Sequence, residues 1–455
     1  MKKLVTLLLA AGMVFSAANG ASAVEMKVSG SWLTSFTFAD NLFNDNYLIE
    51  DAGSDGSFNA AQRIRINFDM VASESLSGRV QLEAANGGDK VKYPGQYHTW
   101  GTSSTGGTGK AVTARLAYLD WMIPTTDVLV RMGRQSFTVP SYTFLSPVFD
   151  SVIDGVAINA PINDMVGLTV AWLRPDATVN KWSEPHKAHT SVDLGYLGLD
   201  VAADGFKVSP WVIAGLKGNA SAGSDMMGVG ADADSRTTVY WVGIGGELTM
   251  FDPFKFTADF MYSGNDADGA AERQGWYAAL GAEMKTSFAT PFLRGWYASG
   301  DDADSKDSNR FMSINGGGSF DASSIYFDGN GLLGATIDNC NPAGTWGVQL
   351  GVKQVSFVED LTHALSVTYF QGTNNTQRVV DGYAPAFEFG PASYMTTSDS
   401  AWSIDFLSSY KLYQNLTANL LLSYMITDFD EKLWLGDQAD FDNAFRGTLN
   451  FTYAF

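Results

Sequence analysis

Along most of this chain, apolar and polar side chains alternate with a period of two, the pattern of a β-strand with one apolar and one polar face. Residues 62–70 show it clearly, because Ile64, Ile66, Phe68 and Met70 alternate with polar side chains. Such segments come in pairs joined by a short turn, and a longer polar loop separates each pair from the next. The predicted strands are Val28–Phe38, Gln62–Met70, Gly78–Ala84, Val112–Ile123, Asp127–Gln135, Val152–Ala160, Met165–Leu173, Thr190–Leu199, Gly205–Leu216, Thr237–Met250, Phe254–Gly264, Arg273–Lys285, Thr290–Gly300, Trp346–Phe357, Leu361–Gly372, Ala401–Leu412, Asn415–Thr427 and Asn443–Phe455.

This pattern predicts an all-β fold, one transmembrane antiparallel β-barrel of about 18 strands, with about 16 as the alternative count. The short turns, such as 251–253 and 413–414, would face the periplasm, and the long loops would be extracellular. A β-sandwich also has many short strands. Here, however, aromatic residues recur at strand ends, as in membrane girdles. These residues are Trp32, Trp121, Trp172, Trp276, Trp346, Trp402 and Tyr424.

Both ends of the chain agree with export to a membrane barrel. In the last strand Phe451, Tyr453 and Phe455 alternate with Thr452 and Ala454, and this pattern resembles the C-terminal signature of Gram-negative outer-membrane barrels. The resemblance implies insertion by the barrel-assembly machinery, with these three aromatic residues as the assembly signal. At the other end, residues 1–23 combine two lysines, an apolar stretch and an Ala-Ser-Ala site, the features of a cleaved signal peptide. We therefore expect one barrel domain, residues 24–455, in the bacterial outer membrane.

Composition excludes several other classes of protein. The chain has 29 Lys and Arg against 49 Asp and Glu, so nucleic acid is not expected as a partner. Its four histidines form no credible catalytic set, and neither a nucleophile elbow nor a paired metal-ligand motif occurs, so we expect no enzyme activity. Cys340 is the single cysteine, which rules out an internal disulfide.

The polar face of the early strands carries several arginines. Charged side chains are costly in lipid but not in a wet lumen, so we expect these residues to point inward. A barrel of about 16–18 strands leaves an aqueous channel. We interpret the arginines as a pore-lining basic wall, made of Arg63, Arg65, Arg79, Arg115 and Arg131. The alternative is a set of individually solvated side chains, partly neutralised by acidic residues on the same strands. Further lumen candidates are Asp69, Glu83, Arg294, Lys353 and Arg446.

The loop of residues 135–151, after the fifth predicted strand, is unusually apolar for an external loop. Folding into the barrel would remove its apolar side chains from water, and we interpret it as a pore-constricting loop. General porins place their constriction loop after strand five as well, but their acidic Pro-Glu-Phe-Gly-Gly-Asp signature is not present here. The alternative is a surface loop that packs on a neighbouring subunit. The candidate constriction residues are Pro140, Tyr142, Phe144, Pro147 and Asp150.

Acidic runs in the predicted loops supply oxygen ligands of the kind that Ca²⁺ prefers. The weak candidates are Asp301, Asp302 and Asp304, and no full EF-hand pattern occurs. Plain solvation is the stronger interpretation of these runs. We therefore expect no cofactor, with a structural Ca²⁺ in the acidic loops as the alternative.

Segments 10–14, 23–25 and 30–32, together with the chain length and the terminal Phe455, resemble the homotrimeric outer-membrane porin family of sulfate-reducing bacteria. The resemblance implies three parallel pores for passive diffusion of small hydrophilic solutes and ions. It also implies contact with outer-membrane lipid and lipopolysaccharide. If so, the early strands, with Val28, Gly30 and Thr34 facing outward, are the natural interface between subunits.

Two other functions stay open. A substrate-selective channel similar to the sugar porins would line its lumen with an aromatic slide, and Trp211 and Tyr277 are inward aromatics too few to form one. An outer-membrane barrel hydrolase is the weaker alternative, because histidine is scarce.

Overall fold

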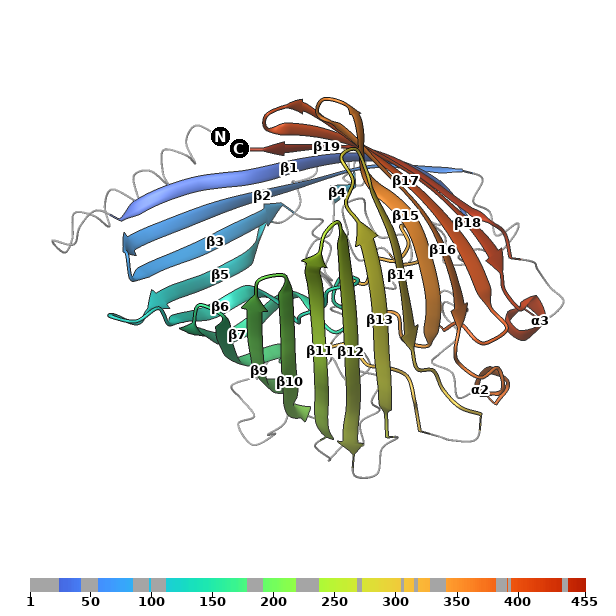
Figure 1. Cartoon of the computed structure of the whole chain (residues 1–455), viewed down its shortest axis with the longest axis horizontal. Coiled ribbons are helices and arrows are strands. Elements are labelled where there is room, and N and C mark those ends of the chain that lie inside the picture. The colour runs from blue at the N-terminus through green and yellow to red at the C-terminus, as the bar shows by residue number, and fades with distance from the viewer. Residues whose placement is uncertain are drawn as a thin grey trace.

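Eighteen long antiparallel strands close into one barrel in the computed structural model of this protein (Figure 1). The structure describes residues 24–41, 56–84, 98–99, 112–177, 191–217, 237–267, 272–303, 307–314, 318–327, 341–381, 391, 394–435 and 441–455. The predicted signal peptide, residues 1–23, lies outside these ranges, as do Asp304 and Cys340. No helix in the described part of the chain is long and apolar enough to cross a membrane.

The strand bounds agree with the alternation pattern to within a few residues at most ends. The elements are β1 Glu25–Asp40, β2 Ser57–Ser73, β3 Leu76–Ala84, β4 His98–Thr99, β5 Val112–Met122, β6 Leu129–Thr138, β7 Asp150–Asn163, β8 Val166–Ala177, β9 Ser191–Ala203, β10 Phe206–Lys217, β11 Thr237–Phe251, β12 Phe254–Ala267, β13 Gln274–Met284, β14 Thr290–Ala298, β15 Thr345–Val358, β16 Leu361–Gly372, α2 Gln377–Val380, β17 Ser400–Tyr413, β18 Leu416–Asp428, α3 Glu431–Trp434 and β19 Ala444–Ala454.

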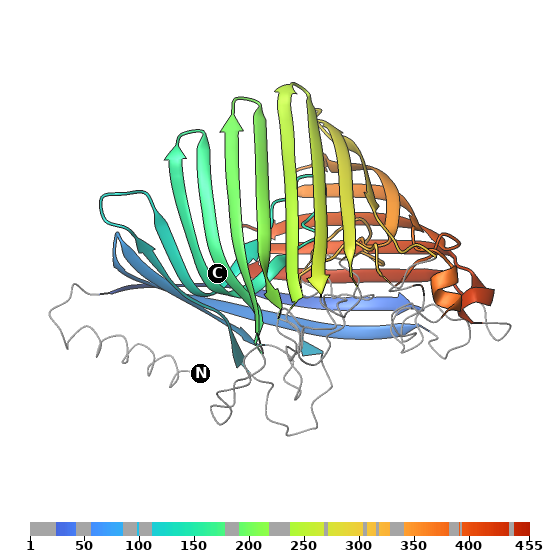
Figure 2. The same cartoon turned by 90° about the horizontal axis from the view of Figure 1, so that it is seen from below.

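Each long strand pairs with its neighbours along the chain, and β1 pairs with both β2 and β19 to close the barrel. The two-residue strand β4 adds a short pairing to β2 and is not part of the closed series. The prediction of 18 strands is therefore confirmed, and the alternative of 16 is wrong. Eight connections are short turns at one end of the barrel (Figure 2), and the longer connections join the opposite ends of the strands. We call these the turn end and the loop end.

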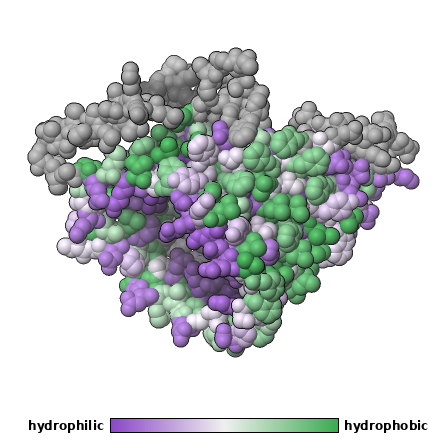
Figure 3. Space-filling model, turned by 90° about the horizontal axis from the view of Figure 1, so that it is seen from above, coloured by the Kyte–Doolittle hydropathy of each residue, from purple (hydrophilic) through white to green (hydrophobic). Residues whose placement is uncertain are grey.

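Alternation along each strand separates an apolar outer surface from the interior. On β11, for example, Trp241 is fully buried inside the barrel whereas Val242 and Ile244 are 45% exposed on the outside. Aromatic rings meet on the outer face near the loop end, where Trp276 stacks on Tyr297 with ring centroids 4.7 Å apart. Figure 3 shows hydrophilic side chains lining a hollow beside a hydrophobic outer surface. An apolar band with aromatic margins is the surface that a barrel presents to lipid.

The C-terminal residue completes the closure of the barrel. The Phe455 N–H donates to the Gly30 carbonyl at 3.0 Å, and the Gly30 N–H donates to the Phe455 carbonyl at 2.7 Å. The Phe455 ring lies directly over Gly30, where an added Cβ would come within 2.6 Å of a ring carbon. Gly30 therefore faces outward, but the terminal side chain of the same barrel covers it.

Candidate functional site

The interior of the barrel has two unlike sides. Around β2, β3, β5 and β6 the inward side chains are charged, with five arginines and three carboxylates. From β7 to β19 the loop-end half of the interior is filled by aromatic and aliphatic side chains, many of them from loops that fold inward. The charged side holds the arginines that the sequence analysis assigns to a basic wall, and most of its residues can be placed one by one.

Two of the arginines are held by bidentate pairs with aspartates. Arg79 donates to both carboxylate oxygens of Asp69 at 2.5 and 3.0 Å. Arg131 does the same with Asp120 at 2.7 and 2.8 Å, and its guanidinium lies 4.1 Å from the centroid of the Tyr118 ring. Such fork-to-fork pairs fix the orientation of the guanidinium, so both arginines are held against the wall with their charges compensated.

A third carboxylate, that of Glu83, forms ion pairs with two arginines. Arg65 Nε lies 2.5 Å from Glu83 Oε2 and Arg115 Nε lies 3.8 Å from the same oxygen. Glu83 is only 2% exposed, whereas both guanidinium side chains keep about a fifth of their surface open. Arg115 also donates to the Gln81 amide oxygen at 2.9 Å. Arg63 lies two residues from Arg65 on the same face of β2.

A β-bulge turns Arg115 toward the interior. Leu119 and Trp121 are exposed on the outer face of β5, so strict alternation would place Arg115 on the outside too. The register between β3 and β5 shifts between Gln81 and Leu82, which adds one residue to β5 at this point. Bulges re-aim side chains in this way, and here the result is that Arg115 joins the wall. Counted together, five arginines against three acidic residues give these eight positions a net charge of +2.

The other lumen candidates lie across the barrel, in different surroundings. Lys353 and Lys255 both contact Glu283 near the turn end, at 2.6 and 3.4 Å. Arg294 contacts Asp321 of an inward-folded loop at 3.5 Å. Arg446 faces inward, as predicted, but it is fully buried and donates to the Ser324 carbonyl at 2.8 Å. The prediction that Arg446 lines the open lumen is therefore wrong, because segment 318–327 covers it.

The loop between β6 and β7 crosses the interior. Its residues 139–149, which we call the constriction segment, reach β12, which lies almost halfway around the barrel from β3. Pro147 and Phe144 are buried, and Tyr142 donates to or accepts from Ser209 on β10 at 2.6 Å. Asp150 is placed differently from the prediction. It begins β7 and accepts a hydrogen bond from Thr138 at 2.6 Å, at the base of the loop and outside the crossing part.

The loop between β14 and β15 also lines the interior, and the alternation pattern does not predict this. Phe320 lies 4.8 Å from Phe144 and 5.1 Å from Trp296 between ring centroids. Trp241 donates from Nε1 to the Met312 carbonyl at 2.9 Å. The apolar run Ile325-Tyr326-Phe327 carries the same signal that marks the constriction segment, namely apolar residues in a long loop, and could have identified it. The inward aromatic residues Trp211 and Tyr277 are likewise buried. They therefore pack within the filled part of the interior and form no aromatic slide along the lumen.

The Asp301 carboxylate accepts hydrogen bonds from other loop residues where three loop segments meet. Its Oδ1 accepts from Ser308 Oγ at 2.7 Å and from Asn309 N at 2.9 Å, and its Oδ2 accepts from Tyr394 at 2.8 Å. Arg378 lies 3.7 Å away. Burial, together with the neighbouring Asp301 charge, raises the pKa of Tyr394 well above its usual range.

These contacts occupy both oxygens of Asp301, which argues against a calcium role for that residue. Asp302 accepts from the Asn309 side chain at 2.6 Å. Within the described ranges, no group of three His, Cys, Asp or Glu residues could hold a metal ion.

The assembly-signal residues lie on the outer face of β19. Tyr453 is 40% exposed and stacks on Phe455 with centroids 5.7 Å apart, while Phe451 is half-buried two residues earlier. These residues lie at the pair of strands that closes the barrel, β19 and β1. An insertion signal at this position would belong to the strand that completes the barrel. Recognition by the assembly machinery stays a prediction.

No family model matches the sequence, and no curated protein matches it. Solved structures match over nearly the whole chain. Pseudomonas aeruginosa OccK2 (OpdF) has a TM-score of 0.56 and 10% identity, over 95% of this chain and 98% of that one. OpdK with vanillate and OprD, from the same organism, have TM-scores of 0.53 and 0.51, identities of 10% and 12%, and cover 94% of this chain and 98% and 96% of theirs. These neighbours are outer-membrane porins, and the likeness shows that this chain has the closed 18-strand antiparallel barrel of that group.

Proposed function

We propose that this protein is an outer-membrane channel that selects small anionic solutes, carboxylates in particular. The observation that carries the proposal is the basic wall, where five arginines lie among three carboxylates and the two guanidiniums beside Glu83 remain partly open to the lumen. A fixed net positive charge along one wall of a narrowed pore attracts anions and repels cations. Guanidinium groups also match the fork geometry of a carboxylate.

Two neighbours support a carboxylate as the solute. One is the crystal structure of OccK2 in complex with glucuronate, and another is OpdK with vanillate. Both ligands are carboxylates. The sequence identity to these two proteins is only 10–11%, so their ligands are properties of those proteins. They support the proposal only because the barrel fold is shared. A general diffusion porin, which the sequence pattern favours, is less consistent with an interior so extensively filled by loops.

The setting of the channel follows from the same proposal. The turn end would face the periplasm and the loop end the outside, with both termini periplasmic. Export by a signal peptide, contact with lipopolysaccharide and insertion by the assembly machinery remain predictions. The homotrimer and the kinship with porins of sulfate-reducing bacteria also stay predictions, which sedimentation of the detergent-solubilised protein and sequences of relatives would test. Neighbours that are channels support a transporter over the barrel hydrolase.

Planar-bilayer recordings test the proposed function directly. In a KCl gradient the reversal potential should show a preference for chloride over potassium. Glucuronate should then block the current in a concentration-dependent way, and glucose, which has a hydroxymethyl group where glucuronate has a carboxylate, should block far less. Equal and negligible effects of the two sugars would favour a general diffusion porin. Absence of ion-conducting events from correctly folded protein would contradict a channel altogether.

A further inference from the structure

We propose that Asp259 on β12 sets the aperture of this channel by fastening the constriction segment to the wall opposite the arginines. Asp259 is 4% exposed and faces the interior. One carboxylate oxygen accepts from the backbone N–H of Tyr142 at 2.9 Å, and the other accepts from the N–H of Thr143 at 2.7 Å. Two consecutive N–H groups on one carboxylate hold the peptide in a single orientation. The inference rests on the proposed function in one respect, that solutes pass through the lumen.

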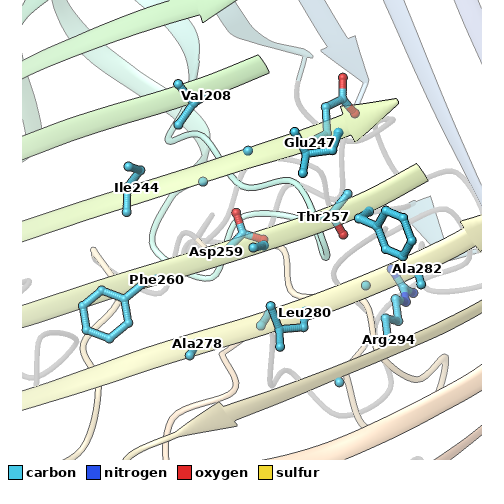
Figure 4. Close-up of a pocket in the computed structure, with 18 of the residues that line it drawn as sticks. Val208, Ile244, Glu247, Thr257, Asp259, Phe260, Ala278, Leu280, Ala282 and Arg294 are labelled. Carbon is cyan, nitrogen blue, oxygen red and sulfur yellow. The ribbon is translucent and has the colours of Figure 1, made fainter. Parts of the chain in front are cut away.

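Neighbouring strands complete the attachment. Thr143 donates from its hydroxyl to Thr257 on β12 at 3.1 Å. Arg294 on β14 donates to the Thr143 carbonyl at 3.1 Å, and its guanidinium lies 4.2 Å from the centroid of the Phe144 ring. Figure 4 shows Thr257 and Asp259 on one strand with Arg294 nearby, and the ribbon of the constriction segment passing beside Asp259. Every polar backbone atom named here therefore has a partner on the wall.

Glycines make room for the segment at two places on this wall. A Cβ added to Gly245 on β11 would meet Asp259 Oδ1 at 2.3 Å and the Tyr142 ring at 2.9 Å. A Cβ added to Gly281 on β13 would meet Thr257 Oγ1 at 2.5 Å and the Thr143 methyl group at 3.2 Å. Any larger residue at these positions would push the segment away from the wall. Two glycines and one carboxylate, from three adjacent strands, thus form a seat shaped for this loop.

The constriction segment is attached to its own strands at its two ends, and Ser146 and Val148 accept hydrogen bonds from Ser319 and Ile314 of the loop between β14 and β15 at 2.8 and 2.9 Å. The seat governs the aperture because it fastens the middle of the segment directly to the strands of the barrel wall. When the segment is seated, Phe144 packs against Trp296 on β14 with ring centroids 5.5 Å apart. On the arginine side, Arg65 and Arg115 keep about a fifth of their surface exposed. Hydrogen bonds to a charged group each change an equilibrium by about tenfold or more. Losing both bonds to Asp259 should therefore lower the ratio of seated to unseated segment by about 100-fold. An unseated segment changes both the cross-section and the distance between solute and basic wall.

Two unrelated substitutions test the seat. Asp259→Ala removes the acceptor, and Gly245→Val keeps the acceptor but fills the space beside it. Gly167→Ala is the matched control, because its Cβ would meet only Asp200 Cβ at 3.9 Å. The reporter is Ser146→Cys, a buried position of the segment, in a chain whose single cysteine is replaced by Cys340→Ser. All variants are compared in this background, as full-length protein refolded into detergent.

Thiol labelling and single-channel conductance are then measured on each variant. Both seat variants should raise the labelling rate of the reporter by about tenfold or more, as expected from the bonds lost, with higher conductance and weaker ion selectivity. Gly167→Ala should behave like the parent. Seat variants that form the folded, heat-modifiable barrel yet label and conduct like the parent would overturn the proposal. If Asp259→Ala does not fold, Gly245→Val decides alone. A parent that conducts no ions would contradict the proposed function, and the labelling result would still decide on the seat.

Discussion

Ion selectivity gives the sharpest test of the basic wall, and Arg63, Arg65 and Arg115 are the residues to change. Arg79 and Arg131 are each held against the wall by a bidentate aspartate, whereas Arg65 and Arg115 share Glu83 and keep about a fifth of their surface exposed. Replacing the other three arginines by alanine changes the eight wall positions from five positive charges against three negative to two against three. The local net charge therefore moves from +2 to −1, and the wall changes sign.

The size of the effect follows from Coulomb's law. One unit charge about 7 Å from a permeating ion contributes about 0.6 kcal/mol in water, which is close to RT. Three charges therefore change the preference for anions over cations by roughly tenfold or more at low ionic strength. The shift should shrink at high salt, because the Debye length falls from about 10 Å at 0.1 M to about 3 Å at 1 M.

Reversal potentials measured across a tenfold KCl gradient provide the assay, with a limit of about 59 mV for a perfectly selective pore. The parent should lie on the anion side of zero and the triple variant on the cation side. Arg174→Ala is the control, because this arginine pairs with Asp193 on the outer face of β8 and β9. An unchanged reversal potential in a folded triple variant would refute the wall. A shift in the control equal to that of the triple variant would do the same.

Three further predictions concern the barrel and its loops. Gly30→Val should abolish barrel closure, because a Cβ would clash with the Phe455 ring and with the Arg65 carbonyl. Phe455→Ala should lower the yield of folded barrel, because the terminal residue pairs with Gly30. Heat-modifiability on gels measures both effects, and normal yields would contradict the role of this pair in closing the barrel. Glu83→Gln removes the carboxylate that two arginines share and should cost about 1–3 kcal/mol of stability in denaturant titrations, with a stronger preference for anions; unchanged stability would argue against the shared contact. Trp241→Phe loses one buried hydrogen bond to the Met312 carbonyl and should cost about 1 kcal/mol of stability. The loss should appear as faster proteolysis of the loop between β14 and β15, and equal cleavage rates would count against that contact.

The strands were predictable because alternation is a local property. Residues 112–123 were expected as a strand, and β5 spans Val112–Met122. Arg115 shows where local reasoning ends, since its inward direction depends on a register shift against β3 that no pattern within β5 reveals. Arg446 shows a second limit. Its strand and face were predictable, but its burial depends on Ser324, 122 residues away along the chain.

The constriction segment was predictable in outline and not in detail. Its apolar composition favours the interior over water, whatever the rest of the barrel does. The point of attachment was not predictable, because Asp259 is 117 residues from Tyr142 and nothing in the sequence distinguishes it from other inward carboxylates. The inward-folded residues 307–314 and 318–327, between β14 and β15, were missed although their aromatic residues carry the same signal.

The sequence by itself determined that this chain is a closed barrel with an apolar outside, a charged inside and an aromatic end. These properties depend only on which side chains alternate along each strand and on the need to satisfy every backbone group in lipid. The tertiary structure alone decided which arginines share which carboxylates, which inward residues the loops cover, and where the constriction segment is held. The arginine pairs depend on the register between neighbouring strands. The other two outcomes depend on contacts between residues more than a hundred positions apart, and closing the barrel is what brings such residues together.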